Sequence, residues 1–325
     1  MYDVRAISVS SVTIHCMSNS VTPSEPFNAC GSTGSGLTSW ELRKHYRMLF
    51  RGVYVSRETP ITVHLLGQAA LLAVEAGSHL SHHTAAQLWG AVVPDDPSVH
   101  VSSRRSRAQR PGIAAHRVKA GQHVVTRRGL RLTSPGQTFL DLAHLLNLVD
   151  LVVLGDSLVK ANRLSPADLV TLAADHRGPH SKLARRAAGL VRSGVDSAME
   201  TRLRLLMIFG GLPEPEVDHR VHAADGSLLY RFDLCYLPWR LLVEYDGRHH
   251  AADDQWHSDI ARDEQFDSWG LRKIVVVAGD IYRTPANTLT RIRHAMREQG
   301  MPVPPLSNEW RRHFPSRSDD LAEPA

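Results

Sequence analysis

Residues 228–250 read LLYRFDLCYLPWRLLVEYDGRHH, with a run of strand-forming residues on either side of Pro238-Trp239. A symmetric hairpin centred on Pro238-Trp239 pairs Asp233 with Glu244 across the two strands. Side chains alternate along a strand, so Asp246 points to the same face as Glu244. The stretch therefore predicts an antiparallel hairpin on which three carboxylates, Asp233, Glu244 and Asp246, converge.

The predicted carboxylate cluster needs a positive charge, because like charges directly opposed across a sheet are destabilising. Carboxylate oxygens are the ligands that Mg²⁺ prefers, so Asp233, Glu244 and Asp246 are predicted ligands of Mg²⁺, with Mn²⁺ as an alternative. Such an ion lowers the pKa of its bound water and screens phosphodiester charge, as nucleic-acid hydrolysis requires. The alternative interpretation is two charged strands with ordinary salt bridges, with Asp246-Gly247 as a simple turn.

Glu200 is a fourth candidate acid, on a helix expected to begin at Ser197. A carboxylate from this helix can support the metal site. Ser197-Ala198-Met199-Glu200 also matches the capping-box pattern, in which the glutamate side chain accepts a hydrogen bond from the N-cap amide. The sequence leaves both roles open.

His250 and Arg262 are further candidates for a role in phosphodiester hydrolysis or phosphate binding. His249 and His250 follow the Asp-Gly turn, and adjacent residues on an extended segment point apart, so at most one faces the metal. His250 is the predicted base, because an imidazole can accept a proton from the attacking water. Arg262 shares a helix face with Asp259, so it either contacts phosphate or pairs with that aspartate.

The last third of the chain has the element order helix, three strands, helix, strand, helix. This order is typical of an α/β domain, in which helices flank a sheet. The elements are expected at residues 197–209, 217–222, 229–236, 240–246, 255–268, 272–278 and 286–298.

Five short motifs follow one another in this region: Ser197-Ala198-Met199-Glu200, Phe232-Asp233, Val243-Glu244-Tyr245-Asp246-Gly247-Arg248-His249-His250, Asp259-Ile260-Ala261-Arg262-Asp263 and Trp269-Gly270. In this order, residues 196–298 resemble the very-short-patch-repair-like branch of the PD-(D/E)XK nuclease superfamily. The resemblance implies a restriction-endonuclease-like mixed sheet flanked by helices. It also implies metal ligation by Asp233 and Glu244, a first-helix acid at Glu200 and a histidine base after the Asp-Gly turn. The superfamily's usual lysine is absent, since position 246 is Asp, and Lys273 is a candidate substitute.

The segment 37–102 shows short helices around one strand, which predicts a winged-helix-like α+β region. A small module that only packs against its neighbour is the alternative. Its elements are expected from Thr38 or Ser39 to Tyr46, at Leu49–Val55, at 63–76 and from Ser81 to Trp89, where Gly90 closes the helix. Leu49-Phe50-Arg51-Gly52-Val53-Tyr54-Val55 and Leu80-Ser81-His82-His83-Thr84-Ala85-Ala86 are similar to the winged-helix region of abortive-infection AbiEi-type antitoxins. That similarity implies DNA binding, transcriptional autoregulation and a cognate toxin as partner.

Positive charge is concentrated after the strand-like residues Val99-His100-Val101. A flexible basic loop can follow a phosphate backbone, although such a run is usually a solvated loop. The formal net charge of +5 favours polyanionic partners. The candidate DNA-binding residues are Arg51, Arg104, Arg105, Arg107, Arg110 and Arg262.

The composition indicates a soluble globular protein of two or more domains. Apolar residues make up 42% and charged residues 22%, and no apolar run is long enough to cross a bilayer, so no membrane partner is expected. The cysteines, Cys16, Cys30 and Cys235, fit neither a disulfide framework nor a Cys-x-x-Cys site, which favours a reducing cytoplasm. The expected segments are a disordered leader (1–36), the winged-helix-like region (37–102), a basic loop and helical linker (103–192), the nuclease domain (193–300) and a disordered tail (301–325).

Three functional hypotheses follow. The first is a metal-dependent DNA endonuclease that the winged-helix-like region delivers to duplex DNA. The second is a non-catalytic DNA-binding regulator of antitoxin type, as a homodimer or with its toxin, because position 246 lacks the lysine. The third is the same hydrolysis on RNA, since the chemistry does not involve the sugar unless a 2′-hydroxyl is contacted.

Overall fold

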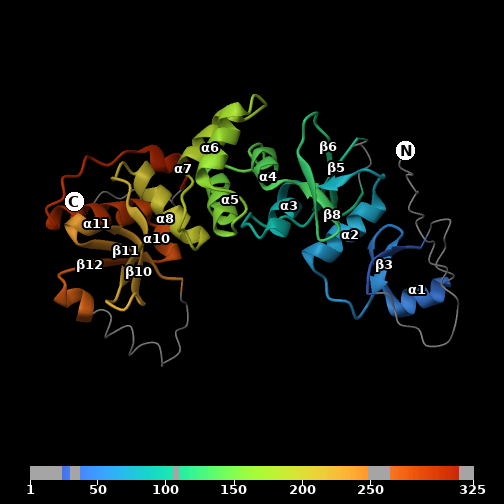
Figure 1. Cartoon of the computed structure of the whole chain (residues 1–325), viewed down its shortest axis with the longest axis horizontal. Helices are drawn as coiled ribbons and strands as arrows, with labels where there is room; N and C mark the ends of the chain where they lie inside the picture. Colours follow the sequence, from blue (N-terminus) through green and yellow to red (C-terminus); the bar gives the residue numbers. More distant parts are fainter. Residues whose placement is uncertain (1–23, 30–36, 105–109, 248–263, 315–325) are drawn as a thin grey trace, which may run out of the picture. The chain divides into compact units, whose positions relative to one another are not determined.

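The computed structural model describes residues 24–29, 37–104, 110–247 and 264–314 (Figure 1). The chain divides into two compact units, Met1–Ala73 and Val74–Ala325. Within the described ranges it is a mixed α/β protein with three sheets. The α/β class expected from the sequence is therefore confirmed.

The first unit is a three-stranded sheet of order β1-β3-β2 with two helices. Its elements are β1 (Phe27–Asn28), α1 (Ser39–His45), β2 (Tyr46–Phe50), β3 (Val53–Ser56) and α2 (Val63–Ala73). Thr38 and Glu41 cap α1 as a full capping box.

Two expectations for this unit were wrong. The strand expected at Leu49–Val55 is the corner of a hairpin, because Gly52, with φ of 82°, allows the chain to reverse after Arg51. The leader expected to be disordered through residue 36 contains β1, which pairs with β3 through Phe27↔Tyr54.

The second unit begins with a five-stranded sheet of order β6-β5-β4-β8-β7. Its strands are β4 (His79–Leu80), β5 (Val99–Ser103), β6 (Ile113–Arg117), β7 (Val124–Arg127) and β8 (Leu130–Thr133). The expected boundary at 102/103 lies inside β5, and the expected helical linker starts with three strands. The short strands are stabilised by pairing rather than by a periodic pattern of their own: β6 pairs with β5, β8 pairs with β4, and β7 pairs with β8.

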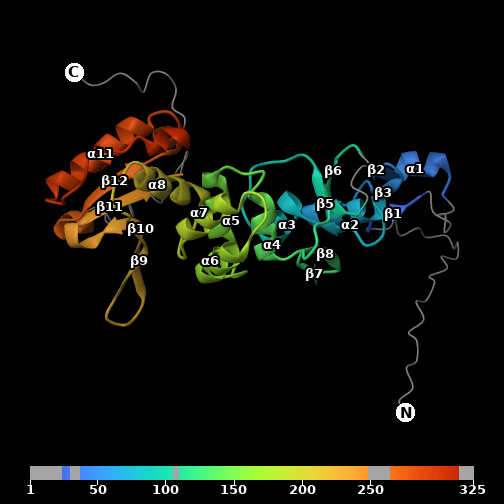
Figure 2. The ribbon, with the colours of Figure 1, turned by 90° about the horizontal axis from the view of Figure 1, so that it is seen from above.

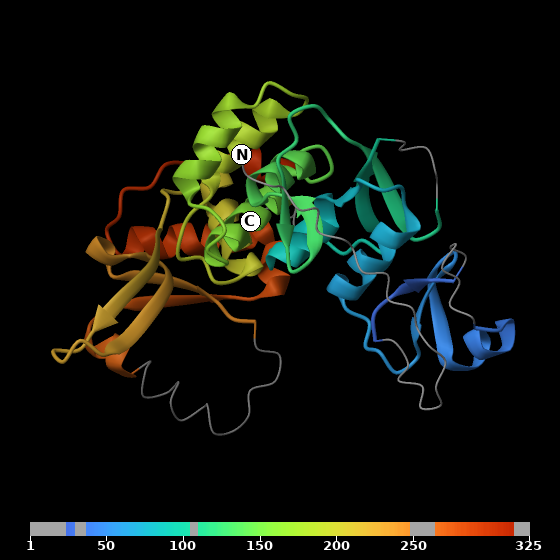
Figure 3. The same cartoon turned by 45° about the vertical axis from the view of Figure 1, so that its right-hand side comes forward.

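Helices follow in this unit and pack as a group beside the sheet (Figure 3). They are α3 (His82–Trp89), α4 (Pro135–Leu142), α5 (Leu148–Lys160), α6 (Pro166–Asp175) and α7 (Ser181–Leu190). Ser165 and Asp168 form a capping box on α6, and Gly90 ends α3 in the left-handed region, as expected. The helix α7 lies within the expected helical linker.

The C-terminal part of the second unit is a four-stranded sheet of order β12-β11-β10-β9, with helices α8 and α11 on one side (Figure 2). The elements are α8 (Ala198–Phe209), β9 (Glu216–His222), β10 (Leu228–Tyr236), η1 (Leu237–Trp239), β11 (Leu241–Tyr245), β12 (Arg272–Val276), α10 (Ala278–Tyr282), α11 (Pro285–Glu298) and η2 (Glu309–Arg312). Strands β9, β10 and β11 are antiparallel and β12 is parallel to β11, so the sheet is mixed. The expected order is confirmed, although α10 was not anticipated and only residues 264–268 of the expected helix 255–268 are described.

Residues 301–314 pack against the C-terminal part instead of forming the beginning of a disordered tail. Met301, Trp310 and Phe314 are all buried, and Ser307 N donates to Gly210 O at 2.8 Å. In the part of the chain that the structure describes, no helix has both the length and the apolar character required to cross a membrane.

Candidate metal-binding active site

The β10–β11 hairpin has the register that the sequence predicts. The paired residues are Leu234↔Val243, Cys235↔Leu242 and Tyr236↔Leu241, around the turn η1. If this register is continued by one residue, Asp233 lies opposite Glu244, and both side chains are half-buried. The centre of the predicted hairpin was thus correct.

Strand β12 brings a lysine to the same face. Leu242 pairs with Lys273, and Glu244 pairs with Val275, in a parallel ladder. Paired residues share a face, so Lys273 and Glu244 project from one side of the sheet about two strand rises, roughly 7 Å, apart along it. Lys273 Nζ lies 5.9 Å from the centre of the Phe266 ring.

Asp246 lies where β11 ends. Its backbone N–H donates to the carbonyl of Val276 at 2.9 Å, which extends the β11–β12 ladder by one bond beyond Tyr245. The backbone of Asp246 is therefore fixed by the neighbouring strand, directly before the exposed Gly247.

Glu200 is in the first turn of α8 and is 8% exposed. Its backbone N–H donates to Ser197 Oγ, as expected of an N-cap, but its Oε2 accepts from the amide of Asp196 at 2.9 Å, one residue before the cap. Burial, followed by the negative charge of Asp233, raises the pKa of Glu200 to about 7. Glu200 and Asp233, from different elements, are therefore close enough for their charges to interact.

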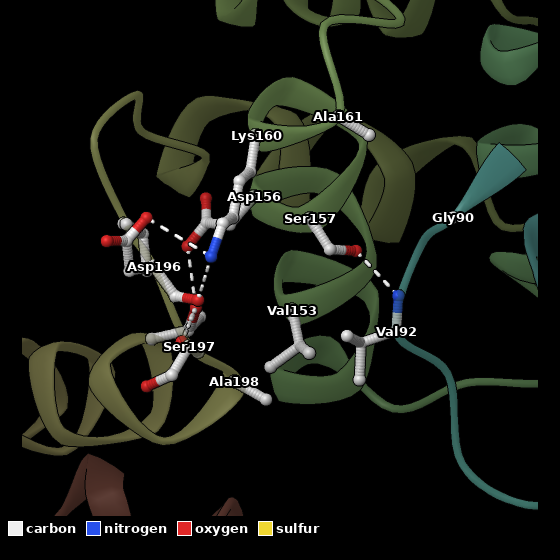
Figure 4. A pocket seen from close by; sticks show the side chains of 12 residues that line it. Gly90, Val92, Val153, Asp156, Ser157, Lys160, Ala161, Asp196, Ser197 and Ala198 are labelled. Carbon is white, nitrogen blue, oxygen red and sulfur yellow. Dashed lines mark hydrogen bonds and ion pairs between the residues drawn. The ribbon is translucent and has the colours of Figure 1, made fainter.

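The turn before α8 is held by the preceding helix α5 (Figure 4). Lys160 donates to the Asp196 carbonyl at 2.6 Å and forms an ion pair with its carboxylate at 3.2 Å. A cavity of about 320 Å³ lies beside this contact, lined by residues that include Val153, Lys160 and Ser197. Deeper in the protein, Asp156 accepts from Thr201 at 2.8 Å and pairs with the fully buried Arg204 at 2.9 Å. These contacts fix the end of α8 that carries Glu200.

Three groups of side chains in the described ranges are close enough to hold a metal ion. They are His82, His116 and His144; His83, Asp96 and His100; and Glu216, His219 and Cys235. Asp233, Glu244 and Asp246 are not among the groups whose ligand atoms all lie within 4.8 Å of one another. The predicted trio shares a hairpin without forming such a compact group.

The candidate DNA-binding residues are distributed over both units. Arg51 is exposed in the β2–β3 turn, and Arg104 and Arg110 flank the connection from β5 to β6. Arg105, Arg107, His250 and Arg262 lie outside the described residues.

The histidine groups are the feature that sequence reasoning missed. His82, His116 and His144 are far apart in the chain, so no ligand spacing marks that group. The adjacent pair His82-His83 at the start of α3 was the available signal.

Comparisons with known proteins show two relatives from Mycobacterium tuberculosis. "Uncharacterized protein MT2308" of strain CDC 1551 / Oshkosh and "Uncharacterized protein Rv2248" of strain ATCC 25618 / H37Rv are each 29% identical over 250 residues, which cover 75% of this chain and 90% of the relative. No family model matches the chain. No solved structure matches it either.

Proposed function

We propose that the C-terminal part of this protein is a metal-dependent endonuclease that hydrolyses DNA phosphodiester bonds, with Asp233, Glu244 and Glu200 at its site. The observation that carries the proposal is the hairpin register, which extends to Leu234↔Val243 and, continued by one residue, sets Asp233 opposite Glu244. The pKa of Glu200, raised first by burial and then by the charge of Asp233, supports it because the second cause requires the two carboxylates to be near each other. A mixed sheet with α8 beside it is compatible with the restriction-endonuclease-like fold that the sequence motifs imply.

The donor set fits a hard divalent cation such as Mg²⁺ or Mn²⁺. Asp233 and Glu244 would hold it, with Asp246 and Glu200 as further oxygen donors, and its chemistry is to lower the pKa of a bound water and to screen phosphate charge. Because Mg²⁺ retains several waters, it needs only one or two carboxylates from the protein, so a compact trio is not required.

Lys273 is proposed to take the place of the lysine that position 246 lacks. It projects from the same face as Glu244, on the neighbouring parallel strand. Its ammonium would orient the attacking water or contact the phosphate charge that increases in the transition state. His250 stays a proposed base.

DNA is the proposed partner, bound by the positive residues Arg51, Arg104 and Arg110 through phosphate contacts. The small sheet with its β2–β3 turn is proposed as the wing of a winged-helix-like region. The exposed position of Arg51 in that turn is what supports this assignment.

One observation favours a second candidate, a non-catalytic DNA-binding regulator. Aspartate at position 246 adds negative charge at the end of β11, where the related enzymes have a positive one. In that case the carboxylates would be a remnant, and DNA binding would be independent of a divalent cation.

Cleavage of supercoiled plasmid with Mg²⁺ and with Mn²⁺ tests the proposal. Wild-type protein should nick or linearise the plasmid, whereas Asp233→Asn and Glu244→Gln should each lower the rate by at least about 100-fold, as loss of a principal charge-stabilising group does. Glu298→Gln, an exposed residue at the end of α11, is the matched carboxylate control and should cleave like the wild type.

The endonuclease and the non-catalytic regulator are expected to respond differently to a chelator. Cleavage abolished by EDTA and by both substitutions supports the enzyme. DNA binding without cleavage, unchanged by EDTA and by Asp233→Asn, supports the regulator, and an absence of DNA binding contradicts both.

A further inference from the structure

Five histidines from four segments of the second unit gather beside the five-stranded sheet. His82 and His83 begin α3, His100 is on β5, His116 is on β6, and His144 follows α4. The rings of His82 and His116 are stacked with their centres 3.6 Å apart, and the ring of His144 is 5.3 Å from that of His82. The proposed nuclease site uses none of them.

We propose that His82, His116 and His144 bind one divalent transition-metal ion of the Zn²⁺ class. One ligand nitrogen of each lies within 4.8 Å of the others. A tetrahedral ion with bonds of about 2.0–2.1 Å needs nitrogens about 3.3 Å apart. Binding therefore requires the side chains to rotate, so that the nitrogens approach one another and the stacked rings of His82 and His116 tilt toward one point.

His82 is fixed by hydrogen bonds that leave one ring nitrogen for a metal. Its Nδ1 lies 2.9 Å from Ser81 Oγ, which also accepts from Ser102 Oγ at 2.9 Å. In the tautomer that donates Nδ1–H to Ser81, Nε2 presents its lone pair to the proposed ion. His82 also has a φ of 50°, and a non-glycine residue held in this region costs about 1 kcal/mol or more, a type of strain that clusters at ligand sites.

His116 is supported by a chain of two further groups. Its Nε2 lies 2.9 Å from His100 Nδ1, and His100 Nε2 lies 3.1 Å from Asp96 Oδ2, at an angle outside the hydrogen-bond direction. If His100 is protonated on Nε2 and His116 on Nε2, the lone pair of His116 Nδ1 is left for the metal. Metal-ligating histidines commonly donate their other ring N–H to a neighbouring acceptor, and His100 Nδ1 would be that acceptor for His116.

Burial disfavours the protonated form of two of these histidines. Burial, followed by the neighbouring histidines, lowers the pKa of His82 to about 2, and burial and His100 lower that of His116 to about 4. Lys119 adds positive charge near His82, but its side chain is exposed. The buried carboxyl of Asp141 interacts electrostatically with His144.

The imidazole donors identify the class of ion and its role. Neutral imidazoles suit Zn²⁺, Cu²⁺ and Ni²⁺ and are poor ligands for Mg²⁺, so this ion is distinct from the one proposed at Asp233 and Glu244. Because His144 is exposed, the fourth position opens toward solvent. The ion would connect α3, β6 and the end of α4, and thereby stabilise this part of the second unit.

Titration of metal-stripped full-length protein with Co²⁺, followed by competition with Zn²⁺, tests the proposal. One equivalent of Co²⁺ should give the visible absorption of a four-coordinate site, and Zn²⁺ should abolish it. His144→Ala, at an exposed position, should keep the fold and weaken binding by at least about 10-fold, and His100→Gln should weaken it about 10- to 100-fold. The exposed His123→Ala is the matched control and should bind like the wild type.

Other variants exclude the competing sites. Asp233→Asn should bind Co²⁺ normally, so failure of the nuclease proposal leaves this one standing. Loss of binding in His83→Ala with retention in His144→Ala would overturn the proposal in favour of His83, Asp96 and His100. Absence of any Co²⁺ absorption, or binding that depends on Asp233, would also overturn it.

Discussion

The Glu200 carboxylate accepts a structural hydrogen bond, but its surroundings destabilise its ionised form. Its carboxylate accepts the Asp196 amide, while burial and the charge of Asp233 disfavour its ionised form. A side chain that only capped α8 would have no reason to be placed near a second carboxylate. The cost is therefore consistent with a site that receives a cation.

The stability of the metal-free protein should reflect this cost as pH rises. The folded-state pKa of Glu200, about 7, exceeds its ordinary value of 4.5. Ionisation of Glu200 therefore does not destabilise the folded state below pH 4.5. The destabilisation increases between pH 4.5 and pH 7 and is complete above pH 7. Its full size is on the order of 3 kcal/mol. Glu200→Gln, which still can accept the Asp196 amide, should become more stable than the wild type across that window.

Urea unfolding of both proteins at pH 5 to 8 in EDTA measures this difference. Parallel pH dependence of the two unfolding free energies would contradict the assignment of the raised pKa to Glu200.

At the scale of elements, two helical glycines differ in what surrounds them. A Cβ on Gly155 of α5 would overlap Val191 Cγ2 and lie 3.3 Å from the Phe139 ring, whereas a Cβ on Gly189 of α7 would meet nothing within 4 Å. The close packing of α5 against its neighbours thus depends on the absence of a side chain at position 155.

The same substitution should therefore have opposite effects at these two positions. Gly155→Ala should destabilise by about 1–3 kcal/mol through overpacking, despite the better helix propensity of alanine. Gly189→Ala should stabilise by up to about 1 kcal/mol, since only the propensity changes. Thermal unfolding of the two variants checks both signs, and equal shifts would contradict the packing of α5.

At the scale of the whole molecule, the net charge of +5 bears on binding rather than on folding. The proposed phosphate contacts of Arg51, Arg104 and Arg110 would release counterions when DNA binds. DNA affinity should therefore fall steeply as salt increases.

Fluorescence anisotropy at several salt concentrations measures this dependence. Arg104→Gln should weaken binding to all sequences and make the slope of log K against log salt shallower by about 1. Arg297→Gln, an exposed residue in the last turn of α11, is the matched control and should leave the slope unchanged. An unchanged slope for Arg104→Gln would remove that residue from the DNA interface.

The local part of the fold followed from the sequence. The residues around Pro238-Trp239 set the hairpin register, and Ser197 and Gly90 marked helix ends, because turn and cap geometry depends on residues that are near each other in the chain. The positions of Asp233 and Glu244 directly beyond the Leu234↔Val243 pair were predictable for the same reason.

Only the tertiary structure decided what distant segments make together. Strand β4 has two residues and pairs with both β5 and β8, the latter more than 40 residues further along, so no local period predicted the five-stranded sheet. The placement of Glu200 near Asp233, of Lys273 beside Glu244 and of His116 against His82 likewise depends on long-range packing. Local sequence patterns determine helices, strands and turns, whereas sites form where elements far apart in the chain pack together. The carboxylate hairpin could therefore be predicted from the sequence, and the histidine cluster could not.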